Sequence, residues 1–265
     1  MEPSTHLPDL DFGLKMRFTK GDIATFFGTE ENDPTLCERR ALIAAEPDKY
    51  SALHPEGEAL LDETIDLSGL PPESFSSLTP REKLHRLGEL WKADYLLMKP
   101  DDEGIFRLRG GCVCFPSHWD LGDKMAKSMA EIHGPVPGLN ETLGRQIDGF
   151  LERIKPDISW ERGNWGLARS PELNLHPSLN TPRLDNTVGL DEVWWRLEEQ
   201  SLVALPKTNG ILFGIKLVIE PLRAIKANPS ARDGLIRALQ SMPDAMAEYK
   251  GLGPARERLI EILAS

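Results

Sequence analysis

The chain is predicted to adopt an α+β fold, with one antiparallel sheet covered by helices. Three features of the sequence support this prediction. Helical patterns dominate residues 1–91, and two strand patterns, a helical stretch and three further strand patterns follow in that order. Asn209-Gly210, between the last two strands, is typical of a tight β-hairpin. We expect a single domain over residues 1–265, made of a helical arm (1–91), a β-rich core (92–222) and C-terminal helices (223–265).

The helical arm contains three predicted helices. Residues 38–46 and 56–65 have helical periodicity, and we expect their acidic side chains to lie on the outer face. The third helix is predicted to begin after Thr79, because Pro80 suits the first helical position and Glu82 completes a capping box. These helices indicate an arm attached to the core rather than an independent domain.

Five strands are expected in the core, at residues 93–98, 105–115, 162–167, 193–205 and 211–219. The last segment is apolar on both faces, which predicts a strand in the centre of the sheet. An amphipathic helix is predicted at 139–154. Residues 170–185 are rich in proline and asparagine, and we expect them to form a surface loop.

Residues 107–138 contain an unusual concentration of Cys, His, Gly and Pro. After the second strand, Ser117 is a candidate N-cap, with Asp120 three residues later. We expect a helix from there to His133, where Gly134 and Pro135 end it. His133 continues the spacing of an apolar stripe, which consists of Leu121, Met125, Met129 and Ile132. Its imidazole can either point into the interior or interact with the helix dipole and a nearby carbonyl.

The charge and the cysteine content exclude several classes of protein. With 42 acidic and 31 basic residues, the formal net charge is −11, which argues against a nucleic-acid or anionic membrane partner. Three cysteines, Cys112 and Cys114 among them, do not make a secreted disulfide framework. We therefore expect reduced thiols, no signal peptide and a cytoplasmic protein. The sequence contains no zinc-type Cys/His spacing, phosphate-binding loop, Rossmann glycine motif or G-x-S-x-G motif.

A row of polar residues is predicted on the strand at 193–205. Alternate residues of a strand share a face, so Arg196, Glu198 and Gln200 line up between Trp194 and Leu202. Such a row is either a stripe that faces solvent or the wall of a pocket.

A second polar cluster lies on the strand at 162–167. Arg162 and Asn164 flank Gly163, directly before Trp165. The guanidinium of Arg162 suits a bidentate contact with a carboxylate, which is either a ligand group or the partner in an ion pair at the strand end.

The run CFPSHWDLGDKM…SMAEIHGPVPG, at residues 114–138, resembles the signature of the haem-dependent oxidative N-demethylase alpha-subunit family. Further similar blocks lie at 162–165, 195–202 and 205–215. The resemblance implies a PAS-like fold that binds one haem b, and the predicted order of elements is compatible with it. One departure is Glu199, where the family usually has a basic residue, on the opposite face of the strand from Glu198.

The resemblance also implies roles for individual residues. His133 is the expected iron ligand, because it closes the apolar stripe and lies in the IHGPVP block. Glu198 is expected to hold an ammonium substrate or relay protons, with Arg196 and Gln200 as the other catalytic residues. The further cofactor-binding residues are His118, Arg162, Asn164, Trp165 and Cys112. The alternatives are a partly exposed cap residue for His118, a strand-end ion pair for Arg162 and small buried strand residues for the cysteines.

The implied function is a haem-dependent monooxygenase that oxidises an amine, by N-demethylation or a related oxidation. This chemistry needs O2 and two electrons, and the sequence has no visible site for NADPH or flavin. The resemblance implies that the electrons come from a separate reductase with flavin and iron–sulfur centres. The alternatives are a non-catalytic haem sensor and a diverged haem oxidase of a biosynthetic pathway.

Overall fold

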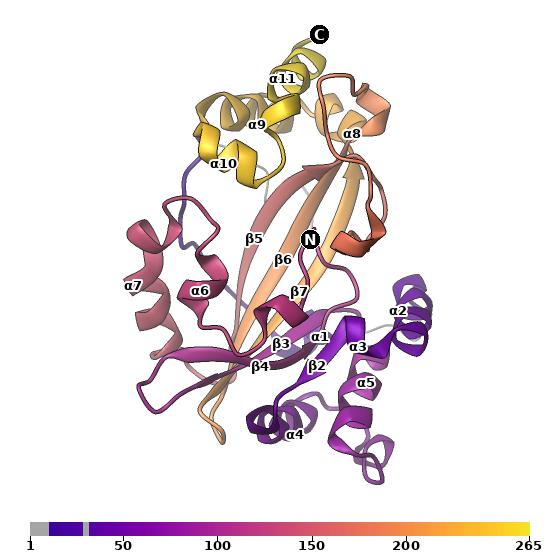
Figure 1. Cartoon of the computed structure of the whole chain (residues 1–265), viewed down its shortest axis with the longest axis vertical. Coiled ribbons are helices and arrows are strands. Elements are labelled where there is room, and N and C mark those ends of the chain that lie inside the picture. Colours follow the sequence, from indigo (N-terminus) through magenta and orange to yellow (C-terminus); the bar gives the residue numbers. More distant parts are fainter. Residues whose placement is uncertain (1–10, 29–31) are drawn as a thin grey trace.

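The computed structural model describes residues 11–28 and 32–265, and it confirms the predicted α+β fold. Seven strands form one antiparallel sheet in the order β1-β5-β6-β7-β3-β4-β2 (Figure 1). The strands are β1 (Thr19–Gly21), β2 (Ser51–Leu53), β3 (Asp94–Pro100), β4 (Phe106–Cys112), β5 (Ser159–Ala168), β6 (Trp194–Leu205) and β7 (Gly210–Pro221). The helices are α1 (Ile23–Phe27), α2 (Pro34–Ala45), α3 (Pro47–Tyr50), α4 (Glu58–Leu67), α5 (Pro80–Leu90), α6 (Met129–His133), α7 (Leu139–Leu151), α8 (Leu222–Ala227), α9 (Pro229–Ser241), α10 (Asp244–Tyr249) and α11 (Arg256–Ala264).

The core strands β3 to β7 correspond to the five predicted strands. β7 lies between β6 and β3, as expected for a strand that is apolar on both faces. Asn209 has a φ of 55° directly before β7, as the predicted hairpin requires. The sequence analysis missed β1 and β2, which have three residues each and pair only at the two edges of the sheet. Three residues are too few for a periodic pattern.

Glu63 of α4 contradicts the expectation that the acidic residues of this helix lie on its outer face. It is buried, and its carboxylate accepts hydrogen bonds from the amides of Lys207 (2.7 Å) and Thr208 (2.8 Å) and from the Thr208 hydroxyl (2.6 Å). The amides of the β6–β7 turn have no partner in the sheet, and without this carboxylate they would be left without a hydrogen-bond acceptor. The buried acid therefore joins the helical arm to the hairpin.

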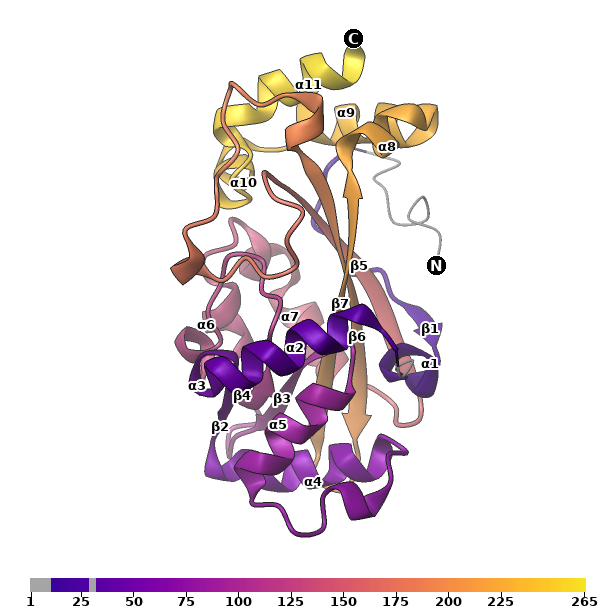
Figure 2. The same ribbon diagram turned by 90° about the vertical axis from the view of Figure 1, so that its right-hand side faces the viewer.

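Helices cover the two faces of the sheet in separate groups (Figures 1 and 2). Alternate residues of β3 divide between them: Tyr95 and Leu97 pack with α4 and α5, whereas Leu96 and Met98 pack with α6 and α7. The C-terminal helices form a third group at the far ends of β5, β6 and β7. Within the described ranges, no helix is both long enough and apolar enough to cross a membrane.

A buried ion pair connects the helical arm to the sheet. Arg39 of α2 is fully buried, and its guanidinium donates to Asp94 of β3 (2.5 Å) and to the Gly88 carbonyl at the end of α5 (2.8 Å). Asp94 also accepts hydrogen bonds from the amides of Cys114 (2.7 Å) and Phe115 (3.0 Å). One carboxylate thus holds α2, β3 and the segment that follows β4.

The predicted continuous helix from Ser117 to His133 is wrong. A single 3-10 turn covers Gly122–Lys124, Ala126 has a φ of 63°, and only Met129–His133 is α-helical. The reason is the first half of β4, which β2 leaves unpaired because it pairs only with residues 110–112. Ala126 donates to the Leu108 carbonyl (2.9 Å), and the Leu108 amide donates to the Lys127 carbonyl (3.0 Å). These hydrogen bonds hold the segment extended.

The capping box was also assigned to the wrong residues. Ser117 does not cap a helix, and Ser128 does. The Glu131 amide donates to the Ser128 hydroxyl (3.2 Å), and the Ser128 amide donates to the Glu131 carboxylate (2.8 Å). The apolar stripe predicted along one helix therefore does not exist as such, although α6 does end at His133.

The Arg39–Asp94 pair leads to a prediction about stability. Asp94→Asn should lower the free energy of unfolding by about 3–5 kcal/mol, because it leaves a buried guanidinium without its counter-charge. Urea unfolding followed by circular dichroism measures this change. Asp48→Asn is the control, since Asp48 pairs with Arg81 on an exposed surface and should change stability by less than about 1 kcal/mol. Equal losses in the two variants would contradict the assigned role.

Candidate functional site

His133, the predicted iron ligand, lies half-buried at the C-terminal end of α6. Its ring forms no hydrogen bond with any residue the structure describes. Burial lowers the pKa of His133 to about 4, and the cations Arg162 and Lys124 contribute to this shift. The imidazole is therefore neutral at pH 7 and has a lone pair available for a metal. The neighbouring Met129 and Ile132 pack against the apolar core of this face.

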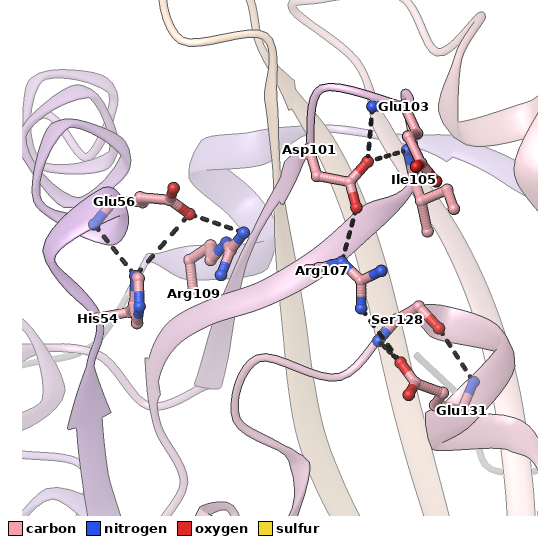
Figure 3. A network of polar contacts seen from close by, with 9 residues as sticks. All are labelled: His54, Glu56, Asp101, Glu103, Ile105, Arg107, Arg109, Ser128 and Glu131. Atoms are coloured by element: carbon pink, nitrogen blue, oxygen red, sulfur yellow. Dashed lines mark hydrogen bonds and ion pairs between the residues drawn. The ribbon is translucent and has the colours of Figure 1, made fainter.

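Arg107 holds α6 in position on the sheet. Figure 3 shows its guanidinium between the β3–β4 turn and the start of α6. It donates to Asp101 (2.7 Å) and to Glu131 (3.2 Å), the acid that closes the capping box of α6. Asp101 in turn accepts the amides of Glu103 and Ile105, each at 3.0 Å. The place of His133 thus depends on a turn that precedes it by about thirty residues of chain.

The polar row predicted on β6 meets the second polar cluster on β5. The strands pair in a register that places Asn164 opposite Glu198 and Arg162 opposite Gln200. One carboxylate oxygen of Glu198, Oε2, accepts hydrogen bonds from Asn164 Nδ2 and Gln200 Nε2, each at 3.0 Å. The other oxygen, Oε1, has no hydrogen-bond partner in the described part of the chain. These side chains are half-buried, so the row does not face open solvent.

Arg162 has no hydrogen bond and no ion pair with any described residue. Its guanidinium carbon lies 6.0 Å from the centre of the Phe18 ring. Burial lowers the pKa of Arg162, and the nearby charge of Glu198 partly offsets this effect. The strand-end ion pair considered from the sequence is not formed within the part of the chain that the structure describes. A half-buried guanidinium without an anionic partner is suited to bind the carboxylate of a ligand.

Lys250 completes this polar cluster, and the sequence analysis missed it. It follows α10, and its ammonium donates to the Trp165 carbonyl (2.7 Å) and to Asn164 Oδ1 (3.5 Å). Burial lowers the pKa of Lys250 to about 8, with Glu198 opposing the shift and Arg162 adding to it. A lysine that follows a C-terminal helix carries no sequence signal that connects it to β5, so only the folded chain identifies it.

Arg196 is buried deeper than the rest of the row, with 4% of its surface exposed. Its guanidinium donates to the carbonyls of Glu172 (2.6 Å) and Leu173 (2.9 Å) and contacts the Ser117 hydroxyl (3.4 Å). Burial lowers the pKa of Arg196 to about 10, against the effect of Glu198. Arg196 therefore fixes the loop after β5 to the sheet, at the end of the polar row.

His118 lies beside Arg196 and Arg183 and is half-buried. Its backbone has a φ of 66°, a conformation that costs free energy for a residue with a Cβ. Burial, followed by the two arginines, lowers the pKa of His118 to about 4. The ring is neutral at pH 7 and has no hydrogen-bond partner among the described residues. His118 is thus a second free imidazole, but it is not the helix cap considered from the sequence.

Trp165 borders the polar cluster, whereas Cys112 lies in a different part of the core. The Trp165 ring stacks on Trp195 with 5.0 Å between ring centres, and the ammonium of Lys250 lies 5.3 Å from it. Cys112 is fully buried in the core group of α4 and α5, where its sulfur is 4.0 Å from the Arg39 guanidinium. The pKa of the neighbouring Cys114 is raised by its hydrogen bond with Cys112 and by burial. The fold does not bring these thiols to His133.

Glu199, the departure from the family pattern, lies on the opposite face of β6 from Glu198. Its carboxylate pairs with Lys216 of β7 at 3.6 Å, and that ammonium lies 4.3 Å from the centre of the Phe26 ring. Its charge is thus neutralised away from the polar cluster.

In residues 11–28 and 32–265, no group of three His, Cys, Asp or Glu side chains is arranged to hold a metal ion. A haem iron takes only one or two ligands from the protein. A single neutral histidine beside an unpaired guanidinium therefore fits a haem better than a bare metal ion.

Comparison with protein families confirms the resemblance found in the sequence. The family model described as "Haem-dependent oxidative N-demethylase, alpha subunit-like" matches residues 47–260. The match includes the residues around His133 and Glu198 described above, from Asp101 to Lys250, but not Arg39. It begins within α3, so it leaves out α1, α2 and β1.

The Arg107 network leads to a prediction about local motion. Arg107→Gln should speed amide hydrogen exchange in the peptide 126–138 by about two- to fivefold, because α6 loses the ion pair that joins its capping residue Glu131 to β4. Hydrogen exchange followed by mass spectrometry measures this. Arg109→Gln is the control: Arg109 pairs with Glu56 (2.6 Å), away from α6, and should leave the peptide unchanged. Equal acceleration in both variants would show that Arg107 does not hold α6 locally.

Proposed function

Because the chain belongs to the haem-dependent oxidative N-demethylase, alpha-subunit-like family, we propose that it binds one haem b and oxidises an amine with O2. N-demethylation is the reaction that the family name specifies. The observation that carries the proposal is a neutral histidine on the same face of the sheet as a half-buried guanidinium that has no ion pair with a described residue and whose charge contributes to the lowered pKa of that histidine. The antiparallel sheet of the chain, with helices on both faces, is compatible with the PAS-like fold that the resemblance implies.

His133 is the proposed axial ligand and Arg162 the proposed partner of a haem propionate. A bound haem supplies the iron centre for dioxygen chemistry. Several half-buried apolar side chains of the same core group would contact the flat macrocycle: Leu96, Trp119, Met129, Ile132 and Phe213. His118 is the second candidate ligand, and its neutral ring makes it chemically competent. Cys112 has no part in this proposed site.

Glu198 is the proposed binding group for the substrate amine. Asn164 and Gln200 hold one of its oxygens, which fixes the orientation of the carboxylate. The other oxygen is free to accept a hydrogen bond from a secondary or tertiary ammonium, or to take a proton from it. Arg196 has a positioning role, since its two terminal guanidinium nitrogens donate to the loop carbonyls at 172 and 173.

Electrons are proposed to come from a separate reductase that carries flavin and iron–sulfur centres. The sequence contains no motif for a nucleotide or a flavin. The net charge of −11 favours association with a basic surface of the partner, and salt weakens such association. The free cysteines fit a reducing, cytoplasmic location.

The assignment of the iron ligand predicts the effect of one substitution. His133→Ala should abolish stoichiometric haem binding or change the absorption spectrum of the ferric protein, and added imidazole should restore it. His118→Ala should change the spectrum less. The measurements are the visible spectrum and the pyridine haemochrome, which should report non-covalent haem because no C-x-x-C-H motif exists. Full haem occupancy with an unchanged spectrum in His133→Ala would refute the ligand assignment.

The role of Glu198 predicts a loss of turnover without a loss of haem. Glu198→Gln keeps the shape and removes the charge, so amine-dependent oxygen uptake and formaldehyde release should fall at least about tenfold, the effect of losing a buried charged contact. Glu199→Gln is the matched control on the other face and should retain activity. Both are assayed with NADPH and a reductase. Haem reduction and O2 binding without amine-stimulated turnover, across a panel of methylamines with the cognate reductase, would instead indicate a sensor.

A further inference from the structure

A cavity lies next to this polar cluster and is lined by none of its residues. Its volume is about 500 Å³, and it lies between α7, the strands β1 and β5, and the chain that joins α7 to β5. Figure 1 shows α7 beside β5, and Figure 2 shows β1 along the edge of β5. The cavity and the polar cluster meet only at Phe18: the ring lines the cavity, and Arg162 lies over it.

Three aromatic rings, from the segment before β1, from α7 and from β5, form one wall of the cavity. Phe18 and Phe150 stack with 4.4 Å between ring centres and 1° between planes. Trp160 meets Phe150 edge-on, at 5.9 Å and 87°. Such a wall offers both a flat face and a ring edge to an apolar guest, and aromatic guests favour these contacts. The indole Nε1 of Trp160 is buried and has no hydrogen-bond partner among described residues, which leaves a donor in need of an acceptor.

Three cations also line the cavity: Lys20, Arg153 and Lys155. None of them forms an ion pair with a described residue, although acidic residues outnumber basic ones by 11 along the chain. Lys20 instead lies 5.7 Å from the centre of the Trp160 ring. Three positive charges without an ion-pair partner among the described residues favour the binding of an anion.

We propose that this cavity binds a small carboxylic acid with a flat apolar body, of the arylalkanoate type. The ring of the ligand packs on the aromatic wall, and its carboxylate meets the guanidinium of Arg153, which suits bidentate contact. The lysines add charge at the rim, and the indole N–H is a further donor. A neutral or cationic analogue of the same shape lacks the group that these donors recognise.

Two kinds of ligand could present a carboxylate on an apolar body to this cavity: a free carboxylic acid, or the propionate edge of a haem. The cavity contains no histidine or cysteine among its lining residues. A haem placed there would lack the ligand that His133 offers elsewhere. We therefore assign the free acid to this cavity, and the test separates the two sources.

The experiment is calorimetric titration of the haem-loaded chain with 3-phenylpropionate. The neutral 3-phenylpropionamide and the cationic 3-phenylpropylamine serve as probes of the same size. Only the carboxylate should bind, and its affinity should fall as salt rises. Arg153→Gln should weaken binding at least about threefold, as expected for one partly exposed charge contact. Arg145→Gln, an exposed arginine on α7 that does not line the cavity, is the matched control and should leave the affinity unchanged.

A second variant tests the cavity itself without endangering the fold. Gly149 lies inside α7 and lines the cavity, and a Cβ there would first meet the flexible end of Arg153, at 2.8 Å. Gly149→Leu should therefore keep or raise the melting temperature, because leucine favours a helix more than glycine. It should also abolish carboxylate binding while haem stoichiometry stays unchanged.

Three results would overturn the proposal. The first is equal affinity for the amide and the carboxylate, and the second is normal carboxylate binding by Gly149→Leu. The third is loss of haem from Gly149→Leu together with no binding of the free acid to the parent chain, which would assign the cavity to a haem propionate. Because the readout is binding of a probe, failure here is distinguishable from failure of the proposed amine oxidation.

Discussion

The buried Arg39–Asp94 pair is the interaction on which the arrangement of the other elements depends. A buried charge is tolerated only when its partner and its hydrogen bonds are all present, so this pair fixes the parts that it touches. Asp94 holds the amides at 114 and 115, where the chain leaves β4. Arg39 holds the end of α5 through the Gly88 carbonyl. The segment that leads to His133 therefore starts from a fixed point on the sheet.

The second constraint is the antiparallel register of β5 and β6. A sheet buries the side chains of one face together, and polar groups on such a face need partners. Glu198 obtains them from Asn164 across the strand pair and from Gln200 along its own strand. Arg162 obtains none from the described residues, which makes it the member of the row that a ligand would satisfy. On the other face, Glu199 is neutralised by Lys216.

The sequence by itself determined the features that depend on short-range rules. The capping box of Thr79 and Glu82, the Asn209-Gly210 hairpin, the apolar central strand and the shared face of Arg196, Glu198 and Gln200 follow from neighbours a few residues apart. A cap acts over three residues and strand alternation over two, so both can be recognised without the rest of the chain. The family signature added the expected role of His133 but no geometry.

Only the tertiary structure decided the features that depend on distant partners. The helical pattern before His133 is interrupted because the part of β4 that β2 leaves unpaired offers backbone hydrogen bonds to residues 126 and 127. Glu63 is buried because a hairpin more than 140 positions later needs an acceptor for its amides. Lys250 reaches Asn164 across 86 positions of sequence. Hydrogen bonds and charges act through space, and local periodicity carries no information about which distant groups the fold brings within reach.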